Sequence, residues 1–398
     1  MKIKELYKKY SLPTYTRAGP VFVKGKGSWL WDEKGRRFLD LFPGWGVSIL
    51  GHCHPGIVKA VSSQAHKLFH LPNNLYSAEQ ALLAEDIVKH SYPAKVFFAN
   101  SGAEAVEGAV KLSRLYGEGK RYEIVTMKNS FHGRTMAALS ATGQKKYKYH
   151  FRPLVPGFKE ARFNDLGDLK KKITKKTVAV LLELIQGEGG VNVAQKEYIK
   201  GVHKICRSKN LLFIVDEVQT GMGRTAKLFC YEHYGITPDI MTLSKGLGAG
   251  IPVAAFVVKK SISSVITPGM HASTFGGSPF AARVSREVFN IIKKEKILDN
   301  VKIRGKHLFQ TILRLKDKFP FIKEIRGMGL MLGIELSVSS YPFFEEALKR
   351  GLIINSTHGN VLRVMPALNI DKKTLDKGLD ILEEVLKSKE AHSWRRSS

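Results

Sequence analysis

The sequence predicts an α/β protein with a mostly parallel central sheet between helices, together with a second, smaller α/β domain. Through the middle of the 398 residues, apolar segments of strand length alternate with helical segments, which is typical of a parallel sheet covered on both faces. After about Arg283 the pattern changes to a long helical stretch followed by strands and further helices. We therefore expect an N-terminal segment (1–50) that packs with the small domain, a large domain (51–285) and a C-terminal small domain (286–398).

The expected elements follow in chain order. Residues 20–41 alternate apolar and polar side chains around a Gly-Lys-Gly turn, which predicts a small antiparallel meander. Strands are expected at 96–99, 122–127, 179–184, 211–215 and 240–243, and a helix from Ala103 to about Tyr116. The C-terminal part predicts an amphipathic helix near 343–350, a strand pair at 352–355 and 361–365, and a closing helix at 373–387. Several central strands end in polar or glycine-rich turns, and open α/β sheets bind ligands outside the carboxyl ends of their strands.

The charge is the unusual part of the composition: 64 Lys and Arg stand against 35 Asp and Glu, a net charge of +29. Nucleic-acid binding would favour clustered basic residues interleaved with stacking aromatic residues. The basic groups are instead short and scattered, as at 145–148, 170–172 and 395–396, the last of these in a tail that we expect to fray. A solvated basic surface is therefore favoured over nucleic-acid binding, while attraction of acidic metabolites or of an acidic protein partner is a third interpretation.

The sequence has no clear feature of a membrane span or of a metal site. No apolar run approaches the ~20 residues of a membrane helix, and no apolar core of a signal peptide follows the N-terminus. Cys53, Cys206 and Cys230 are far apart and odd in number, which favours free thiols in a reducing, cytoplasmic setting. The run His52-Cys53-His54 is similar to a metal cluster, but no second ligand pair accompanies it, so no metal site is expected.

The first candidate for chemistry is Lys245, which follows the strand at 240–243 and precedes three glycines. A P-loop is excluded because its lysine comes after the glycines. A lysine at the end of a buried strand is costly unless it has a partner, and glycines beside it let the backbone approach a bulky ligand. A surface lysine before a flexible loop is the plainer alternative. A lysine that forms an imine with an aldehyde cofactor fits both facts.

Two other strand ends strengthen the cofactor interpretation. The strand at 211–215 runs into Asp216 and Glu217, and a buried aspartate can stabilise the protonated pyridine nitrogen of pyridoxal 5'-phosphate (PLP). A metal-binding or capping pair is the alternative there. At Ser101-Gly102-Ala103 a strand gives way to a helix start, where backbone N–H groups and the helix dipole favour a phosphate, although a simple helix cap would look the same. The three features together favour PLP.

The chain also resembles the class III aminotransferases, PLP-dependent enzymes of fold type I that act on terminal amines, and within them the acetylornithine aminotransferase group. The resemblance runs from about Pro20 to Pro366. It rests on several motifs spread along the chain, namely Phe98-Ala99-Asn100-Ser101-Gly102-Ala103-Glu104-Ala105, Phe131-His132-Gly133-Arg134-Thr135, Gln186-Gly187-Glu188-Gly189-Gly190, Asp216-Glu217-Val218-Gln219-Thr220-Gly221, Ser244-Lys245-Gly246 and Ser273-Thr274-Phe275-Gly276-Gly277.

The resemblance implies a role for each matched position around the cofactor. Lys245 would form the imine and then carry the proton, and Asp216 would pair with the pyridinium nitrogen. Glu183 lies at a strand end near the ring, where it would support Gln219 or the cofactor oxygen. The remaining cofactor-binding positions that the resemblance implies are Ser101, Gly102 and Ala103 for the phosphate, Phe131 for stacking on the ring, His132, Gln219 near the phenolic oxygen, and Thr274, which would reach the phosphate of the neighbouring subunit in a homodimer.

Substrate roles are implied in the same way. Arg134 would bind the distal carboxylate of the substrate, and Arg363 would grip the α-carboxylate of glutamate or 2-oxoglutarate. Glu188 would be the gate that pairs with Arg363 when an ω-amine occupies the site. Without the resemblance, a surface ion pair is the plainer interpretation of either arginine. Trp45 stands where ornithine aminotransferases carry a tyrosine, and because an indole cannot accept a hydrogen bond, it argues against free ornithine as the substrate.

The resemblance thus implies transfer of the δ-amino group of N2-acetylornithine to 2-oxoglutarate, which gives the semialdehyde and glutamate in arginine biosynthesis. The alternatives are a lysine-pathway aminotransferase whose substrate is attached to an acidic amino-group carrier protein, or another ω-aminotransferase for succinylornithine, ornithine or 4-aminobutyrate. From a different class, a basic nucleic-acid-binding protein on a former enzyme fold is also considered.

Overall fold

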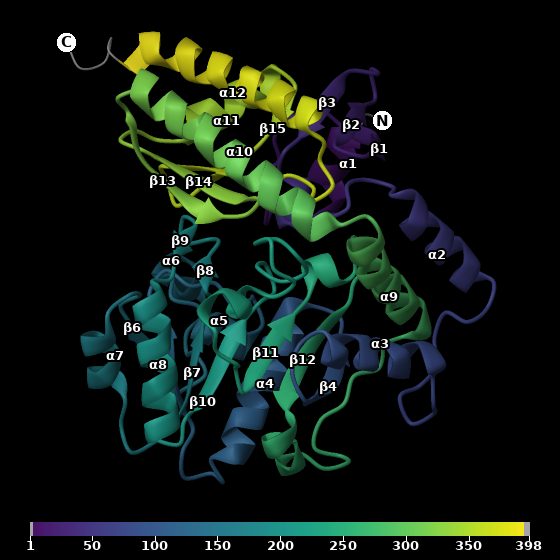
Figure 1. The fold of residues 1–398 in the computed structure, drawn as a ribbon, viewed down its shortest axis with the longest axis vertical. Coiled ribbons are helices and arrows are strands. Elements are labelled where there is room, and N and C mark those ends of the chain that lie inside the picture. Colours follow the sequence, from purple (N-terminus) through teal and green to yellow (C-terminus); the bar gives the residue numbers. More distant parts are fainter. Residues whose placement is uncertain (1–2, 394–398) are drawn as a thin grey trace.

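A seven-stranded sheet forms the centre of the molecule in the computed structural model, which describes residues 3–393 (Figure 1). The pairing of neighbouring strands is parallel, except that one strand near the edge runs antiparallel to both of its neighbours. The expectation of a mostly parallel sheet is therefore confirmed. From one edge to the other the strands are β4 (Ala94–Ala99), the antiparallel β12 (Ala254–Lys259), β11 (Ile240–Leu243), β10 (Leu212–Asp216), β7 (Thr177–Leu182), β5 (Glu123–Met127) and β6 (Phe158–Ala161).

Helices cover both faces of this sheet because its strands are apolar on both sides. In β10, Ile214 packs in one buried cluster with Val106 of α4 (Gly102–Tyr116), whereas Phe213 packs in another with Val202 of α8 (Lys196–Ser208). All six residues of β7 are buried, as expected for a central strand of a parallel sheet. Other helices of this part of the chain are α2 (Pro55–Ala65), α3 (Ala78–Lys89), α5 (Met136–Ala141), α6 (Lys145–Lys148), α7 (Leu166–Lys172) and α9 (Pro279–Lys294).

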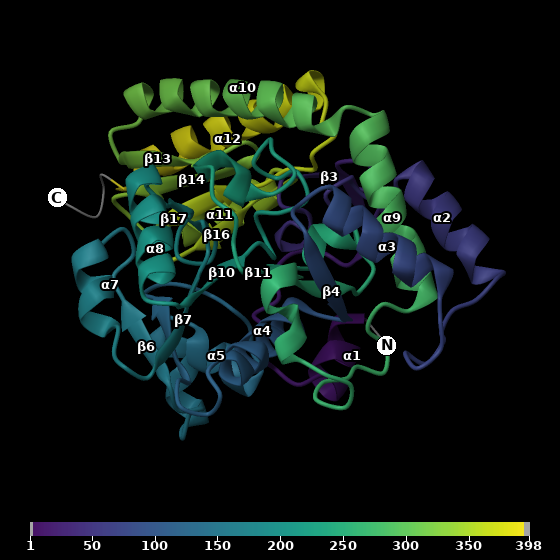
Figure 2. The same cartoon turned by 60° about the horizontal axis from the view of Figure 1, so that its bottom comes forward.

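A second, antiparallel sheet lies beside the central one, and two long helices cover it (Figures 1 and 2). Its strand order is β13 (Ile322–Met328), β14 (Met331–Leu336), β17 (Val361–Val364) and β16 (Asn355–Thr357). The helices of this part are α10 (Ile297–Lys318), α11 (Tyr341–Lys349) and α12 (Lys372–Ser393).

The meander expected at 20–41 forms as three antiparallel strands, β1 (Phe22–Lys26), β2 (Trp29–Asp32) and β3 (Arg37–Asp40). β3 then pairs in parallel with β15 (Leu352–Ile353), so this segment adjoins the C-terminal elements. The strand pair expected at 352–355 and 361–365 is therefore wrong for its first half. β15, which ends at Ile353, pairs with β3, and it is the next strand, β16, that pairs with β17.

The N-terminus begins with α1 (Ile3–Tyr10), which has no buried residue. The basic end of the chain, for which fraying is expected, lies outside the described residues. No helix between residues 3 and 393 combines the length and the apolar character that a bilayer span requires.

Candidate active site

A cavity of about 260 Å³ opens where β10 and β11 end and α4 begins. It brings together ten of the residues singled out in the sequence, from five separate segments of the chain. Those that line it are Gly102, Ala103, Phe131, His132, Arg134, Glu183, Glu188, Asp216, Gln219 and Lys245. Ser101, Arg363 and Trp45 lie directly behind this lining, because each is bonded to a lining residue or next to one in the chain.

Lys245 occupies a strained position directly after β11. Its φ angle is 44°, in the left-handed region that a side chain other than glycine rarely adopts. Such strain persists only where the surrounding structure enforces it, and it is common at functional sites. Burial lowers the pKa of the Lys245 ammonium, although Glu188 acts in the opposite direction. A lowered pKa increases the share of neutral amine, which is the form that can act as a nucleophile or accept a proton.

Asp216, at the end of β10, is held as an acceptor by three groups. Nδ1 of His132 lies 2.8 Å from its Oδ2, and the hydroxyl of Thr242 and the N–H of Val218 donate to its Oδ1 at 3.0 and 3.1 Å. The side chain is 5% exposed, and its only salt bridge among the described residues is to His132. A buried carboxylate with no fixed cation opposite it is free to pair with a cationic ligand atom in the cavity.

The start of α4 forms the end wall of the cavity. Ser101 caps the helix by accepting from the N–H of Glu104 at 3.3 Å, which leaves the N–H groups of Gly102 and Ala103 in the first turn, where α-helices lack internal acceptors. A Cβ added to Gly102 would lie 2.9 Å from Val218 Cγ1, so only glycine lets these two segments approach so closely. The helix start therefore offers donors and the positive end of a dipole to an anion.

Glu183, at the end of β7, joins two loops of the site. Its Oε1 accepts from the N–H of Phe131 at 2.8 Å and its Oε2 from the N–H of Gly187 at 3.2 Å. Burial raises the pKa of this carboxyl to about 7. Sequence reasoning expected Glu183 to support Gln219 or the cofactor oxygen. The bonds that the structure gives it instead hold the backbone on either side of the cavity.

Arg363 is buried in the middle of β17 and makes a network on one side of the site. Its Nη2 donates to Glu188 Oε1 at 2.7 Å, and its Nη1 to Gln219 Oε1 at 3.2 Å. Both Nε and Nη2 donate to Asn355 Oδ1. Although burial alone would raise the pKa of Glu188, the nearby Arg363 and Lys245 lower it below its usual value. The arginine thus lies beside Lys245, with its charge matched by the carboxylate of Glu188.

Three predicted residues lie at the margin of this arrangement. The guanidinium of Arg134 lies 3.9 Å from the centre of the Tyr147 ring, at the exposed side of the cavity. Trp45 is half exposed, with a φ of 56°, and its carbonyl accepts from Gln219 Nε2 at 3.3 Å. Thr274 is exposed and does not line the cavity of its own chain.

Sequence reasoning missed two residues of the site. Thr242 contacts Asp216, and Asn355 holds Arg363. Asn355 lies directly opposite Arg363 in the pairing of β16 with β17, so a correct strand register would have identified it. Thr242 lies two residues before Ser244 on β11, opposite Asp216 in the parallel ladder, and the same argument applies.

The histidines of His52-Cys53-His54 have separate partners. Nε2 of His52 lies 2.8 Å from Asp40, whereas Nδ1 of His54 accepts from the N–H of Gly56 at the start of α2. Among the described residues, no group of three His, Cys, Asp or Glu side chains is arranged to hold a metal ion.

The donors and acceptors of the cavity fit PLP. A helix start suits its phosphate, a buried carboxylate suits its ring nitrogen, and a lysine whose pKa is lowered by burial suits its aldehyde. The close approach of Val218 to Gly102 leaves no room for a side chain at the helix start. When bound, PLP supplies an electron sink for the bond that breaks in the substrate.

Comparison with known proteins agrees with this geometry. The family model of the class III aminotransferases matches residues 13–386. The acetylornithine aminotransferase of Caldanaerobacter subterraneus is 49% identical over 384 residues, which is 95% of this chain and 98% of that protein. The acetylornithine aminotransferase of Methanocaldococcus jannaschii is 44% identical over 96% of this chain and 97% of its own.

Solved structures of aminotransferases are also similar to this chain. The ornithine aminotransferase of Toxoplasma gondii, described with PLP at its active site, superposes with a TM-score of 0.94 at 32% identity and covers 98% of this chain and 94% of its own. The acetylornithine aminotransferase of Elizabethkingia anophelis superposes with a TM-score of 0.86 at 31% identity, covering 97% of this chain and 98% of its own. The chain belongs to the class III aminotransferase family.

Proposed function

We propose that the protein uses PLP to transfer the δ-amino group of N2-acetylornithine to 2-oxoglutarate, giving N-acetylglutamate semialdehyde and glutamate in arginine biosynthesis. The observation that carries the proposal is the Glu188–Arg363 pair beside Lys245. With the pair closed, Arg363 is not free to bind a carboxylate next to the reacting amine, so the site suits an ω-amine. With the pair open, Arg363 is available for the α-carboxylate of glutamate or 2-oxoglutarate. Relatives named acetylornithine aminotransferase, at 42–49% identity, support this choice of amine.

Each residue of the cavity then has a defined task. Lys245 binds the cofactor and moves the proton between the two carbon atoms that exchange it. Asp216 would stabilise the protonated ring nitrogen of PLP, and Phe131 would stack on the ring. The start of α4 would hold the phosphate, and in a homodimer Thr274 of a second copy of this chain would reach the same phosphate. Arg134, at the exposed side, binds the distal carboxylate of the substrate.

A carrier-bound amine is the second candidate, and the net charge of +29 is the observation that favours it. An acidic carrier protein would be attracted to such a surface, and this attraction would weaken with salt. The named relatives support the free amine instead. Activity on free N2-acetylornithine that does not depend on salt, with no complex formed with an acidic carrier protein, would leave the free amine as the substrate.

A half-reaction screen tests the proposal. The PLP-loaded protein is mixed with each amine separately, namely N2-acetylornithine, N2-succinylornithine, ornithine and 4-aminobutyrate, and loss of the cofactor absorbance band is followed in time. We expect the highest kcat/KM for N2-acetylornithine. The Lys245→Ala variant, with Lys171→Ala as the control at an exposed position, should show no turnover. Comparable kcat/KM values for ornithine and N2-acetylornithine would refute the choice of amine, and normal turnover by Lys245→Ala would refute the whole assignment.

A further inference from the structure

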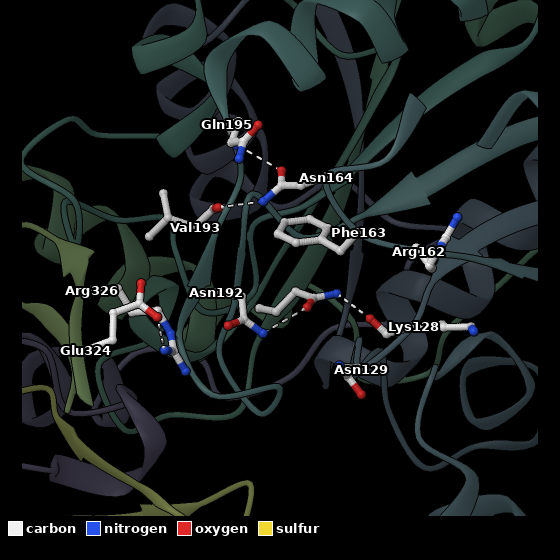
Figure 3. Close-up of a pocket in the computed structure, with 11 residues that line it drawn as sticks. Lys128, Asn129, Arg162, Phe163, Asn164, Asn192, Val193, Gln195, Glu324 and Arg326 are labelled. Atoms are coloured by element: carbon white, nitrogen blue, oxygen red, sulfur yellow. Dashed lines mark hydrogen bonds and ion pairs between the residues drawn. The ribbon is translucent and has the colours of Figure 1, made fainter. Parts of the chain in front are cut away.

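A second cavity, of about 490 Å³, is lined by residues that are close in the chain to those of the active site. Figure 3 shows the side chains that line it. The cavity opens between the ends of β5 and β6, the hairpin formed by β8 (Ile185–Gln186) and β9 (Asn192–Val193), and β13 of the C-terminal sheet. We call it the outer cavity. Its position at the carboxyl ends of two parallel strands is one where open α/β sheets bind ligands.

Two segments of the chain form a common wall between the outer cavity and the active site. In the first segment, Lys128 and Asn129 line the outer cavity, while residues 131–134 line the active site. In the hairpin, Gln186 lines the outer cavity, while its neighbours Ile185 and Glu188 line the active site. Gln186 Nε2 donates to the carbonyl of Lys128 at 2.8 Å, which ties the two segments together from the outer side.

The side chains of the outer cavity also hold the loop that carries Glu188. Asn192 Nδ2 donates to the carbonyl of Gly189 at 2.9 Å, and Arg326 Nε donates to the carbonyl of Gly190 at 2.9 Å. A ligand that engages Asn192 or Arg326 therefore contacts the residues that fix the backbone directly after the Glu188 gate.

One rim of the outer cavity carries two basic side chains. Lys128 and Arg162 lie together on it, on the right in Figure 3. Arg162 is paired with Asp165 at 2.8 Å and with Asp168 at 3.8 Å, whereas among the described side chains no hydrogen bond or ion pair is made by the Lys128 ammonium. The Lys128 charge is thus available to a carboxylate from solution.

The opposite rim is negative. Glu324 and Arg326 lie on the left in Figure 3, joined at 2.9 Å, and Arg326 is also paired with Glu335. Two carboxylates therefore share one guanidinium, which leaves net negative charge on this rim. Glu324 is the more exposed of the two and faces the cavity, where it can accept from an ammonium group.

Neutral amides lie between the two charged rims. Asn164 accepts from the N–H of Gln195 at 2.9 Å and donates to the carbonyl of Val193 at 3.1 Å, so its position is fixed. The side chains of Asn129 and Gln195 complete the amide lining. Amides both donate and accept, and they suit an uncharged polar group better than an apolar or a charged one.

We propose that the outer cavity binds a free α-amino acid with an uncharged polar side chain. Its carboxylate would bind at Lys128, its ammonium at Glu324, and its side chain among the amides. Occupancy then restrains the hairpin and keeps Glu188 closed on Arg363. The binding site is independent of which amine is the donor, because the outer cavity and the active site share no lining residue.

Isothermal titration of the PLP-loaded protein with L-glutamine tests the binding site. We expect one binding event, weakened about tenfold or more, which is ~1.4 kcal/mol, in Lys128→Gln and in Glu324→Gln. The matched controls Lys171→Gln and Glu197→Gln, both exposed, should bind as the unmodified protein does. Arg363→Lys should still bind, with a smaller change in affinity than Lys128→Gln, because that arginine is coupled to the outer cavity only through Glu188. Absence of binding, or binding lost in Arg363→Lys but kept in Lys128→Gln, would overturn the proposal.

The effect on the gate is measured separately, in the half-reaction with glutamate. L-Glutamine should lower kcat/KM for glutamate in the unmodified protein and leave it unchanged in Lys128→Gln. An equal decrease in both proteins would mean that L-glutamine competes in the active site, and would overturn the link to Glu188. Since binding is read as heat, a wrong assignment of the amine donor would leave the titration result unaffected.

Discussion

Oε1 of Glu188 lies 2.7 Å from Nη2 of Arg363, whose side chain is completely buried. The arginine has further bonds to Gln219 and Asn355, so it stays in place when the carboxylate leaves. Glu188 lies in the loop between β8 and β9, and its side chain is 20% exposed. The two residues therefore form a pair in which one partner is fixed and the other can move aside.

Replacing Glu188 by Gln should favour substrates, such as glutamate, whose carboxylate is next to the amine that reacts. The amide removes the negative charge that competes for Arg363, a competition of roughly 1–3 kcal/mol for a charged hydrogen bond. We expect kcat/KM for glutamate to rise about tenfold relative to kcat/KM for N2-acetylornithine, measured in separate half-reactions. The exposed Glu197→Gln is the control. An unchanged ratio would show that Glu188 does not act as a gate.

Replacing Arg363 by Lys should have the opposite effect. Lysine keeps the charge but loses the planar fork that matches a carboxylate. We expect kcat/KM for glutamate and for 2-oxoglutarate to fall about a hundredfold, with a smaller effect on the ω-amine. Arg314→Lys, at an exposed position of α10, is the control. If both half-reactions lost activity equally, Arg363 would serve the structure of the site and not one substrate.

Replacing Asp216 by Asn should leave a folded protein with little activity. The amide keeps the shape of the side chain and can still accept from Thr242 and Val218, but it lacks the charge that stabilises a protonated ring nitrogen. A loss of about a hundredfold or more in kcat is expected, as for removal of other fixed charge-stabilising groups. Thermal unfolding checks the fold, and the exposed Asp380→Asn is the control. Activity within a few-fold of the unmodified protein would refute this role.

The sequence predicted Lys245, Asp216 and Gly102 as neighbours because each lies at or just beyond the carboxyl end of a strand of the same sheet. In a parallel sheet those ends meet at one edge, so local patterns are enough to predict the centre of the site. The direction of β12 was not predictable in this way. Its apolar run indicates a buried strand, but whether it runs parallel or antiparallel depends on the connections and not on the side chains.

The partners of Glu183 and Arg363 could not be predicted for a different reason. Glu183 accepts from backbone N–H groups, which every residue except proline carries, so no sequence pattern marks them. Asn355 meets Arg363 through the register of a three-residue strand, and such short strands have no periodicity to read. The error in pairing 352–355 has the same origin, since tertiary contacts with β3 decide where that strand begins.

The raised pKa of Glu183 makes stability depend on pH. The carboxyl titrates near 4.5 when unfolded and at about 7 when folded, so the folded state binds more protons between these values. Stability should therefore fall as the pH rises from about 4.5 to about 7, by as much as ~3 kcal/mol for this group. Urea unfolding of the cofactor-free protein at about pH 5 and about pH 8 should show this decrease, with a smaller one in Glu183→Gln than in the unmodified protein or the exposed control Glu384→Gln. Equal decreases in all three would assign the effect to other groups, such as Glu217, whose buried carboxyl has its pKa raised to about 7 as well.

Replacing Trp45 by Tyr should shift the choice of amine. The backbone of Trp45 is held by the bond from Gln219 Nε2 to its carbonyl, so a tyrosine would be held in the same place. The phenol oxygen can accept a hydrogen bond from the free α-ammonium of ornithine, which the indole cannot do. One such bond to a charged group contributes roughly 1.5–3 kcal/mol, so kcat/KM for ornithine should rise about tenfold relative to N2-acetylornithine. Trp31→Tyr, in the N-terminal meander, is the control. A rise in both kcat/KM values by the same factor would mean that Trp45 limits access to the site, and that selection against free ornithine depends on other residues.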